Sequence, residues 1–290
     1  MQNWVGYGTM FLADHITGQV RIVAPNRAQR LGPRPEGCPF CLGNEEHTPP
    51  EIDRIIGDDG VWRARAVPNL FPLSDVHEVL IPTHRHATSL RELTPDEWVS
   101  LVELWQRRLT QAPCSSDRYL HLFVNDGKGA GASLPHTHAQ LVSVPRSHEV
   151  LSLTHHLAEG EECAACALLT SAEELLIAEL GAFQLLAHPT PRTGGGMLLY
   201  PIEHHTDATT LPVAALAQAL HCAVQALPDG DFNCWLVHDP HSSAHTYVEF
   251  VPRTSIPAGV EMALGIGVSI IDPEAAAAAA RERLAGALPV

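Results

Sequence analysis

The pattern of apolar and polar positions predicts the same succession of elements twice along the chain. In the first half, a strand over residues 61–67 leads through a turn containing proline and asparagine to an apolar run over residues 78–82. In the second half, residues 183–187 lead through the segment PTPRTGGG to an apolar run over residues 197–201. This self-similarity indicates two copies of one structural unit.

Helical patterns follow at matching places. LTPDEWVSLVELWQRRL has an apolar residue every three or four positions, with Thr94 as its predicted N-cap and Pro95 at its first helical position. LPVAALAQALHCAVQAL has the corresponding place in the second half. In both halves an apolar strand comes next, over residues 119–125 and 232–238, followed by a loop and a histidine-bearing strand. A last helix is predicted after Asp272.

These elements predict an α+β protein built from two tandem repeats, each an antiparallel sheet flanked by helices. The first repeat would span residues 1–146 and the second residues 147–290, with residues 147–162 as the linker. A chain of 290 residues is long enough for two modest domains with real cores.

Composition and charge narrow the possible functions. With 45% hydrophobic and 18% charged residues the chain is expected to fold throughout. A formal net charge of -15 argues against binding to nucleic acid, so an anionic substrate has to be met by a few placed cations. No apolar run is long enough to cross a bilayer, and the first residues do not resemble a secretion signal. We therefore expect a soluble, cytoplasmic protein without a membrane partner.

The cysteines point to metal. Four of the seven form two C-x-x-C pairs, Cys38/Cys41 and Cys163/Cys166, one at the start of each repeat. In a cytosolic chain such pairs favour metal or redox chemistry over structural disulfides. The remaining three stand alone, and we interpret them as buried apolar residues: Cys114, Cys222 and Cys234.

Histidines at matching offsets complete two ligand sets for Zn²⁺. In the first repeat, Cys38 and Cys41 would be joined by two histidines, His86 and His136. His84 competes with His86, which is preferred because it follows the preceding proline at the same offset as His205 does in the second repeat. The second set is then Cys163, Cys166, His205 and His245, with His204, His238 and His241 as nearby substitutes. Four protein ligands leave no open position, so such a site is structural.

The densest chemical signal is FVNDGKGAGASLPHTHAQLVSVP, residues 123–145. Three glycines, among them Gly131, allow a loop to turn backbone N–H groups toward an anion. A strand would then present His136 and His138 on one face, with Gln140 next in line. If a metal fixes His136, His138 is held at a set distance beyond it.

These residues fit nucleotidyl transfer through a histidine. Neutral imidazole attacks phosphorus near neutral pH, provided that its other ring nitrogen donates to a carbonyl, and the phosphoramidate can pass the group on. Ser133 and Gln140 can donate hydrogen bonds as charge develops on the phosphate oxygens. Arg27 and Arg30, in the segment APNRAQR, are the candidate cations for the phosphates.

The sequence at this point resembles the galactose-1-phosphate uridylyltransferase family of the histidine-triad superfamily. The resemblance extends over nearly the whole chain, through ITGQVRIVAPNRAQR, CPFCLGNEEHTPPE, VPNLFP, VHEVLIP, NDGKGAGASLPHTH-AQ and PAGVEM. It implies two histidine-triad-like repeats and a ping-pong reaction. His138 would take a nucleoside monophosphate from a nucleotide sugar, and a sugar 1-phosphate would accept it.

The resemblance also implies roles for further residues. Asn125, Gly131, Ser133 and Gln140 would hold the phosphates, with Asn69 near the nucleotide. Glu261 would bind the hexose hydroxyls, often across the interface of a homodimer. Tyr247 stands where a second H-x-H motif would place its nucleophile, so the second repeat is expected to be catalytically silent.

The sequence leaves open which nucleotide the protein uses and which acceptor receives it. The leading hypothesis is uridylyl transfer between UDP-glucose and galactose 1-phosphate, in galactose metabolism. Leu70, where many uridylyltransferases have an aspartate, and the predicted second zinc favour a phosphorylase or adenylyltransferase that uses ADP-glucose or a dinucleoside polyphosphate. A triad hydrolase is less favoured because Gln140 replaces its third histidine, and a zinc-stabilised binding protein is less favoured because His138 and Ser133 are present.

Overall fold

The computed structural model describes residues 3–6, 9–13, 20–31, 37–146 and 163–287. Within these ranges a ten-stranded antiparallel sheet has the order β4-β5-β6-β8-β7-β12-β13-β11-β10-β9. Read from its two edges toward the centre, the sheet has the same succession of strands in both halves of the chain. The two halves meet at the pair β7 and β12, where Asn125 lies opposite Asn233.

Five strands come from each half. The strands of the first half are β4 (Asp53–Ile56), β5 (Trp62–Pro68), β6 (His77–Ile81), β7 (Arg118–Asp126) and β8 (Ala139–Pro145). Those of the second half are β9 (Leu176–Leu180), β10 (Phe183–Ala187), β11 (Met197–Pro201), β12 (Phe232–Val237) and β13 (Tyr247–Pro252). A separate three-stranded sheet comprises β1 (Asn3–Gly6), β2 (Thr9–Ala13) and β3 (Val20–Val23).

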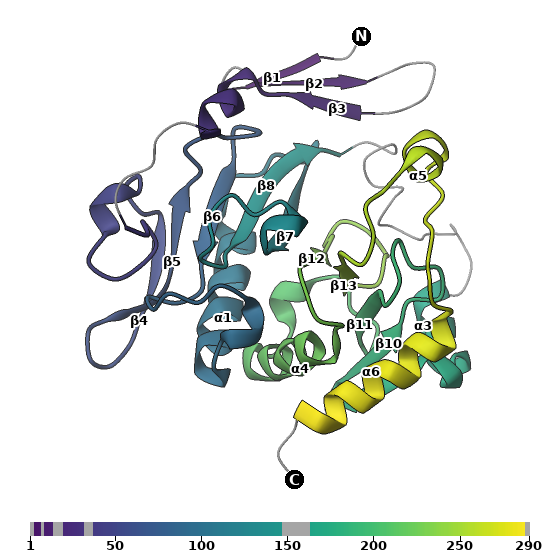
Figure 1. The fold of residues 1–290 in the computed structure, drawn as a ribbon. Helices are drawn as coiled ribbons and strands as arrows, with labels where there is room; N and C mark the ends of the chain where they lie inside the picture. Colours follow the sequence, from purple (N-terminus) through teal and green to yellow (C-terminus); the bar gives the residue numbers. More distant parts are fainter. Residues whose placement is uncertain (1–2, 7–8, 14–19, 32–36, 147–162, 288–290) are drawn as a thin grey trace.

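Three helices cover one face of the large sheet: α1 (Pro95–Gln111), α4 (Val213–Ala226) and α6 (Pro273–Ala287). Helix α1 packs on β4, β5 and β6, and α4 and α6 both pack on β9 and β10 (Figure 1). Helix α1 begins with a capping box in which Thr94 accepts from Glu97 N and the Glu97 carboxylate accepts from Thr94 N. The predicted caps Thr94 and Asp272 are both confirmed.

Strand periodicity divides the core into two layers. Leu80 and Leu185 point toward the helices and belong to the main apolar cluster, whereas their neighbours Val79 and Leu186 point to the other face. On that other face the Cys38 segment packs beside Val79, and α3 (Ala164–Ser171), directly after Cys163, contributes Leu168. Both cysteine pairs therefore lie on the face opposite the helices.

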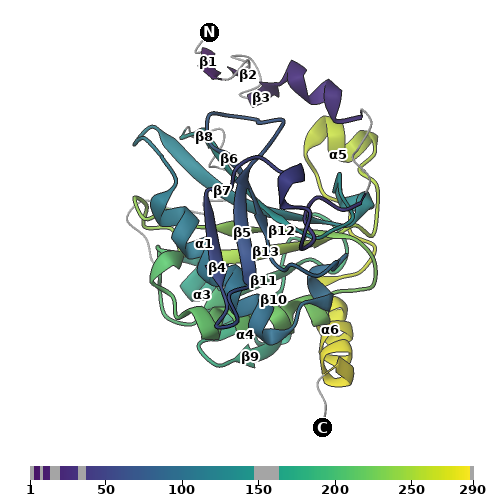
Figure 2. The same ribbon diagram turned by 90° about the vertical axis from the view of Figure 1, so that its left-hand side faces the viewer.

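The ends of the molecule carry the remaining elements. In Figures 1 and 2 the three-stranded sheet lies at the opposite end from α6. It contacts the large sheet where the Arg118 guanidinium lies 5.2 Å from the centre of the Phe11 ring. Helix α5 (Gly259–Leu264) precedes an exposed segment that leads to α6.

The predicted fold class is confirmed, with one addition: the two five-stranded sets share a single sheet. The division at residues 146 and 147 stays a prediction, because the predicted linker, residues 147–162, falls outside the described residues. Cys234 is buried as expected and Cys222 is partly buried, whereas Cys114 is exposed because it lies in the loop between α1 and β7. Among the described residues, no helix has both the length and the apolar character needed to cross a membrane.

Candidate active site and metal-binding groups

Four side chains from three separate segments converge beside β8. The ligand atoms of Cys38, Cys41, His86 and His136 all lie within 4.8 Å of one another. Cys38 Sγ is 3.5 Å from His136 Nδ1, and Cys41 Sγ is 3.4 Å from His86 Nδ1. Zinc bonds of ordinary length in a tetrahedron place sulfur and nitrogen ligands about 3.5 Å apart. The group thus has the composition and spacing of a closed zinc site.

The surroundings of this group also fit a metal. His136 is fully buried, and its second ring nitrogen, Nε2, lies 3.2 Å from the carbonyl oxygen of Thr83, which sets Nδ1 as the nitrogen that faces the sulfurs. Burial and the adjacent Cys38 thiol raise the pKa of Cys41 to about 11. Two neighbouring thiolates are thus unfavourable without a cation, and bound zinc would stabilise both. His84, the competing residue, lies outside the group and packs against Trp62 with ring centres 5.8 Å apart.

His138 follows two residues after His136, a member of this group, and its side chain is buried. Its Nδ1 lies 2.9 Å from the backbone carbonyl oxygen of His136, so Nδ1 carries the proton and Nε2 carries the lone pair. Phe40, from the turn between the two cysteines, packs edge-on against both imidazoles, with ring centres 5.8 Å from His136 and 5.3 Å from His138. The cysteine turn therefore also restrains the second histidine.

The H-x-H segment departs from its expected place on a strand. Strand β8 begins at Ala139, so His136 and His138 lie in the segment that enters it. The reason is that Thr137 bonds away from the ladder: its N–H donates to Ala87 O at 2.8 Å and its hydroxyl to the Asp126 carboxylate at 3.0 Å. Asp126 also accepts from Leu90 N at 2.6 Å. These bonds tie the segment to the loop after β6.

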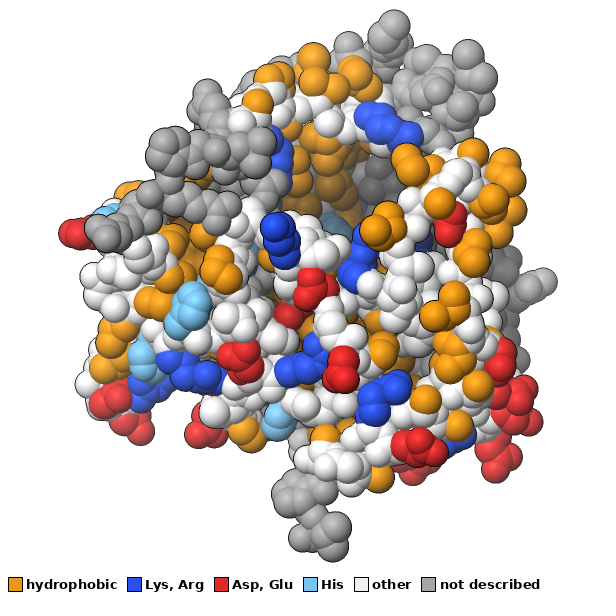
Figure 3. Space-filling model, viewed as in Figure 1, with side chains coloured by type: hydrophobic (Ala, Val, Ile, Leu, Met, Phe, Trp, Pro, Cys, Tyr) orange, Lys and Arg blue, Asp and Glu red, His pale blue; other side chains and the backbone are white. Residues whose placement is uncertain are grey.

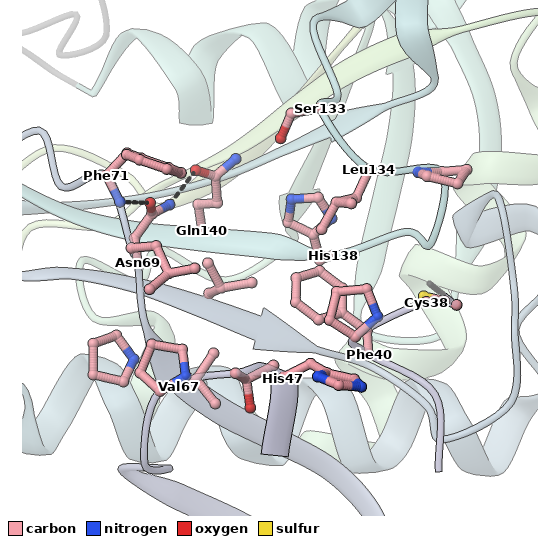
Figure 4. Close-up of a pocket in the computed structure, with 18 of the residues that line it drawn as sticks. Cys38, Phe40, His47, Val67, Asn69, Phe71, Ser133, Leu134, His138 and Gln140 are labelled. Carbon is pink, nitrogen blue, oxygen red and sulfur yellow. Dashed lines mark hydrogen bonds between the residues drawn. The ribbon is translucent and has the colours of Figure 1, made fainter. Parts of the chain in front are cut away.

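A cavity of about 510 Å³ opens over His138 (Figure 4). The lining is largely apolar, from Phe40, Val67, Leu70, Phe71 and Leu134, with a few polar groups that converge on His138. Asn69, Ser133 and Gln140 are among these polar groups, and His47, Thr48 and His86 also line the cavity. Among the described residues that line it there is no carboxylate. An apolar slot with convergent hydrogen-bond donors suits a nucleoside joined to phosphate.

The glycine-containing loop between β7 and His136 borders a second, larger cavity of about 1020 Å³. Ser133, Leu134 and Pro135 line both cavities and so form the wall between them. The second cavity presents three cationic side chains, Arg27, Arg91 and Lys128, with Asp126 and Asp231 on the same lining. Figure 3 shows a hollow on one face with apolar side chains inside it and Lys or Arg side chains around it.

The second half of the chain supports the glycine-containing loop. Asp231 accepts a hydrogen bond from Gly129 N, and the Asn233 amide donates to Ala130 O at 2.9 Å. Gly127 adopts a φ of 91°, and a Cβ there would overlap the Asp231 carboxylate. The loop conformation thus needs glycine at this position and depends on residues of β12 and the loop before it.

A hydrogen-bond network fixes the polar side chains opposite the loop. His77, buried on β6, lies with Nε2 3.0 Å from Gln140 Oε1 and with Nδ1 2.9 Å from Leu73 N. Asn69 Nδ2 also points to Gln140 Oε1, at 3.4 Å, and Asn69 Oδ1 accepts from Phe71 N at 2.9 Å. In Figure 4 the Gln140 oxygen faces Asn69 and its nitrogen faces away from Asn69.

The second repeat also gathers ligand-type side chains. Cys163, Cys166 and His204 form a group, with Cys166 Sγ 3.4 Å from His204 Nδ1. His205, which the offset from Pro201 predicts, is not in this group. The predicted fourth ligand, His245, packs beside His204 with ring centres 4.8 Å apart. The offset from Pro201 correctly indicates which loop contributes a histidine. The backbone of that loop, however, places the adjacent His204 beside the two cysteines.

The other predicted residues are not among those that line the cavity over His138. Arg27 lines the larger cavity and donates to Phe71 O at 3.0 Å, whereas the side chain of Arg30 is outside the described residues. Asn125 accepts from Asn233 at 2.8 Å and is not among the residues that line either cavity. Glu261 caps α5 by accepting from Ala258 N at 3.0 Å. Gly131 has a φ of 92° and lines the larger cavity.

Several residues of the site had no recognisable signal in the sequence. In the sequence, Phe40 is only part of the cysteine turn, and His77 is only the residue before the apolar run over residues 78–82. Asp231 and Asn233 lie more than 100 residues beyond the loop that they support. Such contacts follow from the strand pairing, which joins β7 to β12, and cannot be read from local spacing.

Comparison with known proteins supports the family resemblance. Residues 53–146 match the HIT domain. ADP-glucose phosphorylase from Arabidopsis thaliana is 23% identical over 93% of this chain and 91% of its own length. Galactose-1-phosphate uridylyltransferase from Thermotoga maritima is 28% identical over 64% of each chain.

Solved structures show the same fold. The ADP-glucose phosphorylase of Arabidopsis thaliana with bound ADP-glucose covers 94% of this chain and 98% of its own, with 23% identity and a TM-score of 0.73. A uridylyltransferase structure covers 96% of this chain and 99% of its own, with 22% identity and a TM-score of 0.76. Together these findings confirm the resemblance to the galactose-1-phosphate uridylyltransferase family of the histidine-triad superfamily.

Proposed function

We propose that this chain is a nucleotidyltransferase that moves a nucleoside monophosphate from a nucleotide sugar to a phosphate-bearing acceptor through a covalent bond to His138. The observation that carries the proposal is the hydrogen bond from His138 Nδ1 to the carbonyl of His136, 2.9 Å long, beneath a 510 Å³ cavity. It makes Nε2 the nucleophilic nitrogen and holds the ring at a set distance from the zinc-type group.

Each step of the proposed reaction exchanges one bond at phosphorus. In the first, the Nε2 lone pair attacks the α-phosphorus, a P–N bond forms, and the bond from phosphorus to the bridging oxygen breaks. The electron pair leaves with the sugar 1-phosphate. In the second, an oxygen of the acceptor phosphate attacks the same phosphorus and the P–N bond breaks, which returns neutral His138. The acceptor is a hexose 1-phosphate in a transferase and inorganic phosphate in a phosphorylase.

Neutral donors and the cations of the larger cavity would stabilise the charge that develops during both steps. Ser133 and the Gln140 amide face the cavity over His138, and Arg27 and Lys128 line its neighbour. The zinc-type group would hold Zn²⁺ through four protein ligands, so the metal would fix His136 and would not bind substrate. The second group, around His204, would also be structural.

UDP-glucose is the donor that the sequence resemblance favours, with galactose 1-phosphate as acceptor. A specific observation favours ADP-glucose with phosphate as second candidate. Leu70, 65% exposed, lines the cavity next to Asn69 and offers a ribose no carboxylate. The relative named for ADP-glucose also matches over most of this chain.

A homodimer forms part of the proposal. Seven large apolar side chains are exposed between residues 256 and 270, from 46% for Val268 to 88% for Ile256. Exposed apolar side chains gathered in one segment are typical of a protein–protein contact. A second copy that covers it would bring Glu261 of α5 toward the partner's sugar. Replacing Met262 by Glu should then yield monomers in light scattering.

A donor panel tests the proposed function. Purified protein is mixed with UDP-glucose or ADP-glucose, with either galactose 1-phosphate or phosphate as acceptor, and nucleotide products are separated by chromatography. One donor should support exchange, and His138→Asn should lower its rate by at least about 10⁴-fold. Exchange at the wild-type rate in His138→Asn would contradict the proposal.

A further inference from the structure

His77 stands out among the buried polar residues that no part of the sequence analysis assigned to a role. Only 4% of its surface is exposed, and it lies on β6 where that strand pairs with β8. Its ring reaches Gln140, the residue proposed to contact the transferring phosphate. A buried imidazole needs partners on both nitrogens, and the identity of those partners determines which nitrogen bears the proton.

The partners of His77 define one tautomer. Leu73 N is 2.9 Å from Nδ1, and a backbone N–H can only donate, so Nδ1 accepts. In neutral imidazole the proton then lies on Nε2. Nε2 lies 3.0 Å from Gln140 Oε1 and 3.3 Å from Asn69 Nδ2. Asn69 Nδ2 can only donate, so the acceptor for the Nε2 proton is the Gln140 oxygen, and the bond runs from histidine to glutamine.

That bond determines the orientation of the Gln140 amide. Its oxygen accepts from His77 and lies 3.4 Å from Asn69 Nδ2. Asn69 is itself oriented, because its own oxygen accepts from Phe71 N at 2.9 Å. Turning the Gln140 amide over would set its NH₂ group against two donors. The observed arrangement instead leaves the NH₂ group on the side away from Asn69, where it can donate (Figure 4).

We infer that His77 is a positioning residue that fixes Gln140 as a hydrogen-bond donor to the transferring phosphoryl group. The inference rests on the proposed function, because it assigns a use to the donor. Without His77, only the longer contact with Asn69, at 3.4 Å, would oppose the turned amide. The Gln140 side chain would then adopt the turned orientation more often, and that orientation does not present N–H to a phosphate oxygen. His77 acts through Gln140 and does not touch the substrate.

A double-mutant cycle tests the inference. His77→Phe keeps an aromatic ring but removes the donor, whereas His77→Gln places an amide nitrogen near the position of Nε2. The rate constant of His138 modification at saturating donor should fall about 10-fold in His77→Phe, because an oriented donor to developing charge is weakened. In His77→Gln this rate constant should return most of the way to the wild-type value. The KM for the nucleotide sugar should change less than about 2-fold in both His77 variants.

The same His77→Phe change in a Gln140→Ala protein should alter the rate by less than about 2-fold, because the residue through which His77 acts is already gone. An equal loss in both backgrounds would overturn the inference, as would a wild-type rate in His77→Phe. Zinc content and melting temperature of each variant serve as folding controls.

A spectroscopic measurement keeps the inference testable if His77→Phe does not fold. Long-range ¹H–¹⁵N correlation spectra of histidine-labelled wild-type protein should show the His77 proton on Nε2. A proton on Nδ1 would overturn the positioning role even in a fully active enzyme. Failure of the wild-type protein to exchange any nucleotide would instead overturn the proposed function, so the two failures are distinguishable.

Discussion

The Nδ1 atom of His138 lies 2.9 Å from the carbonyl oxygen of His136, and this contact joins a metal-type ligand to the imidazole beyond it. His136 holds the His138 ring through its backbone carbonyl and not through its side chain. The contact sets the tautomer of His138, and the burial of His136 among Cys38, Cys41 and His86 fixes the carbonyl to which it donates. We therefore expect metal binding by the four-residue group to be coupled to the reactivity of the neighbouring His138 ring.

The metal group allows a matched test with two adjacent histidines. His86→Ala should reduce the bound zinc by one equivalent in atomic absorption, while His84→Ala should keep it, because the His84 ring lies outside the group. A metal present at 100 times its dissociation constant contributes about 2.7 kcal/mol, which corresponds to a melting temperature lower by roughly 5–10 °C in His86→Ala. Equal zinc loss in both variants would rule out the assignment of His86.

A second matched pair concerns the other half of the chain. His204→Ala should remove one zinc equivalent, because Cys166 Sγ is 3.4 Å from His204 Nδ1, and His205→Ala should not. The measurement is zinc stoichiometry after extensive dialysis against a weak chelator. The opposite result would restore the ligand set that the sequence offset indicates.

Much of the fold was predictable because it depends on periodic patterns. Strands β10 and β11 occupy the expected residues, and the caps of α1 and α6 are where Thr94 and Asp272 indicate. His86 was also identified by its offset from Pro82. The same offset indicated His205, yet the structure groups His204, because a loop has no fixed periodicity and one change of turn presents the adjacent side chain.

The interactions that could not be predicted are long-range hydrogen bonds. The contact of His77 with Gln140 depends on the register of β6 against β8, and that of Asp231 with Gly129 on the approach of the two halves. Neither residue type indicates such a role, since a histidine at the start of an apolar strand and an aspartate in a turn are common. Only the three-dimensional register makes them part of the site.

The glycine-containing loop should tolerate alanine differently at its two positive-φ positions. Gly131→Ala should cost about 1–2 kcal/mol for the left-handed backbone alone, since no described residue lies within 4 Å of the added Cβ. Gly127→Ala should cost more, by about 1.5–3 kcal/mol, because it also displaces Asp231 from its hydrogen bond to Gly129 and because Gly127 combines its positive φ with a ψ of 163°, a conformation almost restricted to glycine. Urea denaturation measures both. Equal losses would show that Asp231 does not restrict the loop.

His121 should make stability depend on pH. Burial lowers its folded-state pKa to about 4, and its ring stacks on Phe123 at 5.5 Å. Because this pKa is depressed, the stabilisation is complete above the unfolded pKa of about 6.5 and is lost as the pH falls toward 4. The loss should reach at most about 3 kcal/mol. In thermal melts between pH 7 and pH 4.5, His121→Phe should lose less stability than wild type; parallel curves would contradict this.

The central claim is the covalent intermediate, and intact-mass spectrometry tests it most directly. Protein is mixed with each nucleotide sugar in the absence of acceptor, and the reaction is quenched at neutral or alkaline pH. The intact mass of the protein is then measured, and peptide mapping locates any adduct. The expected result is one added nucleoside monophosphate on His138, together with one equivalent of released sugar 1-phosphate, and no addition in His138→Asn. An adduct on another residue, or exchange activity in wild-type protein without any adduct, would contradict it.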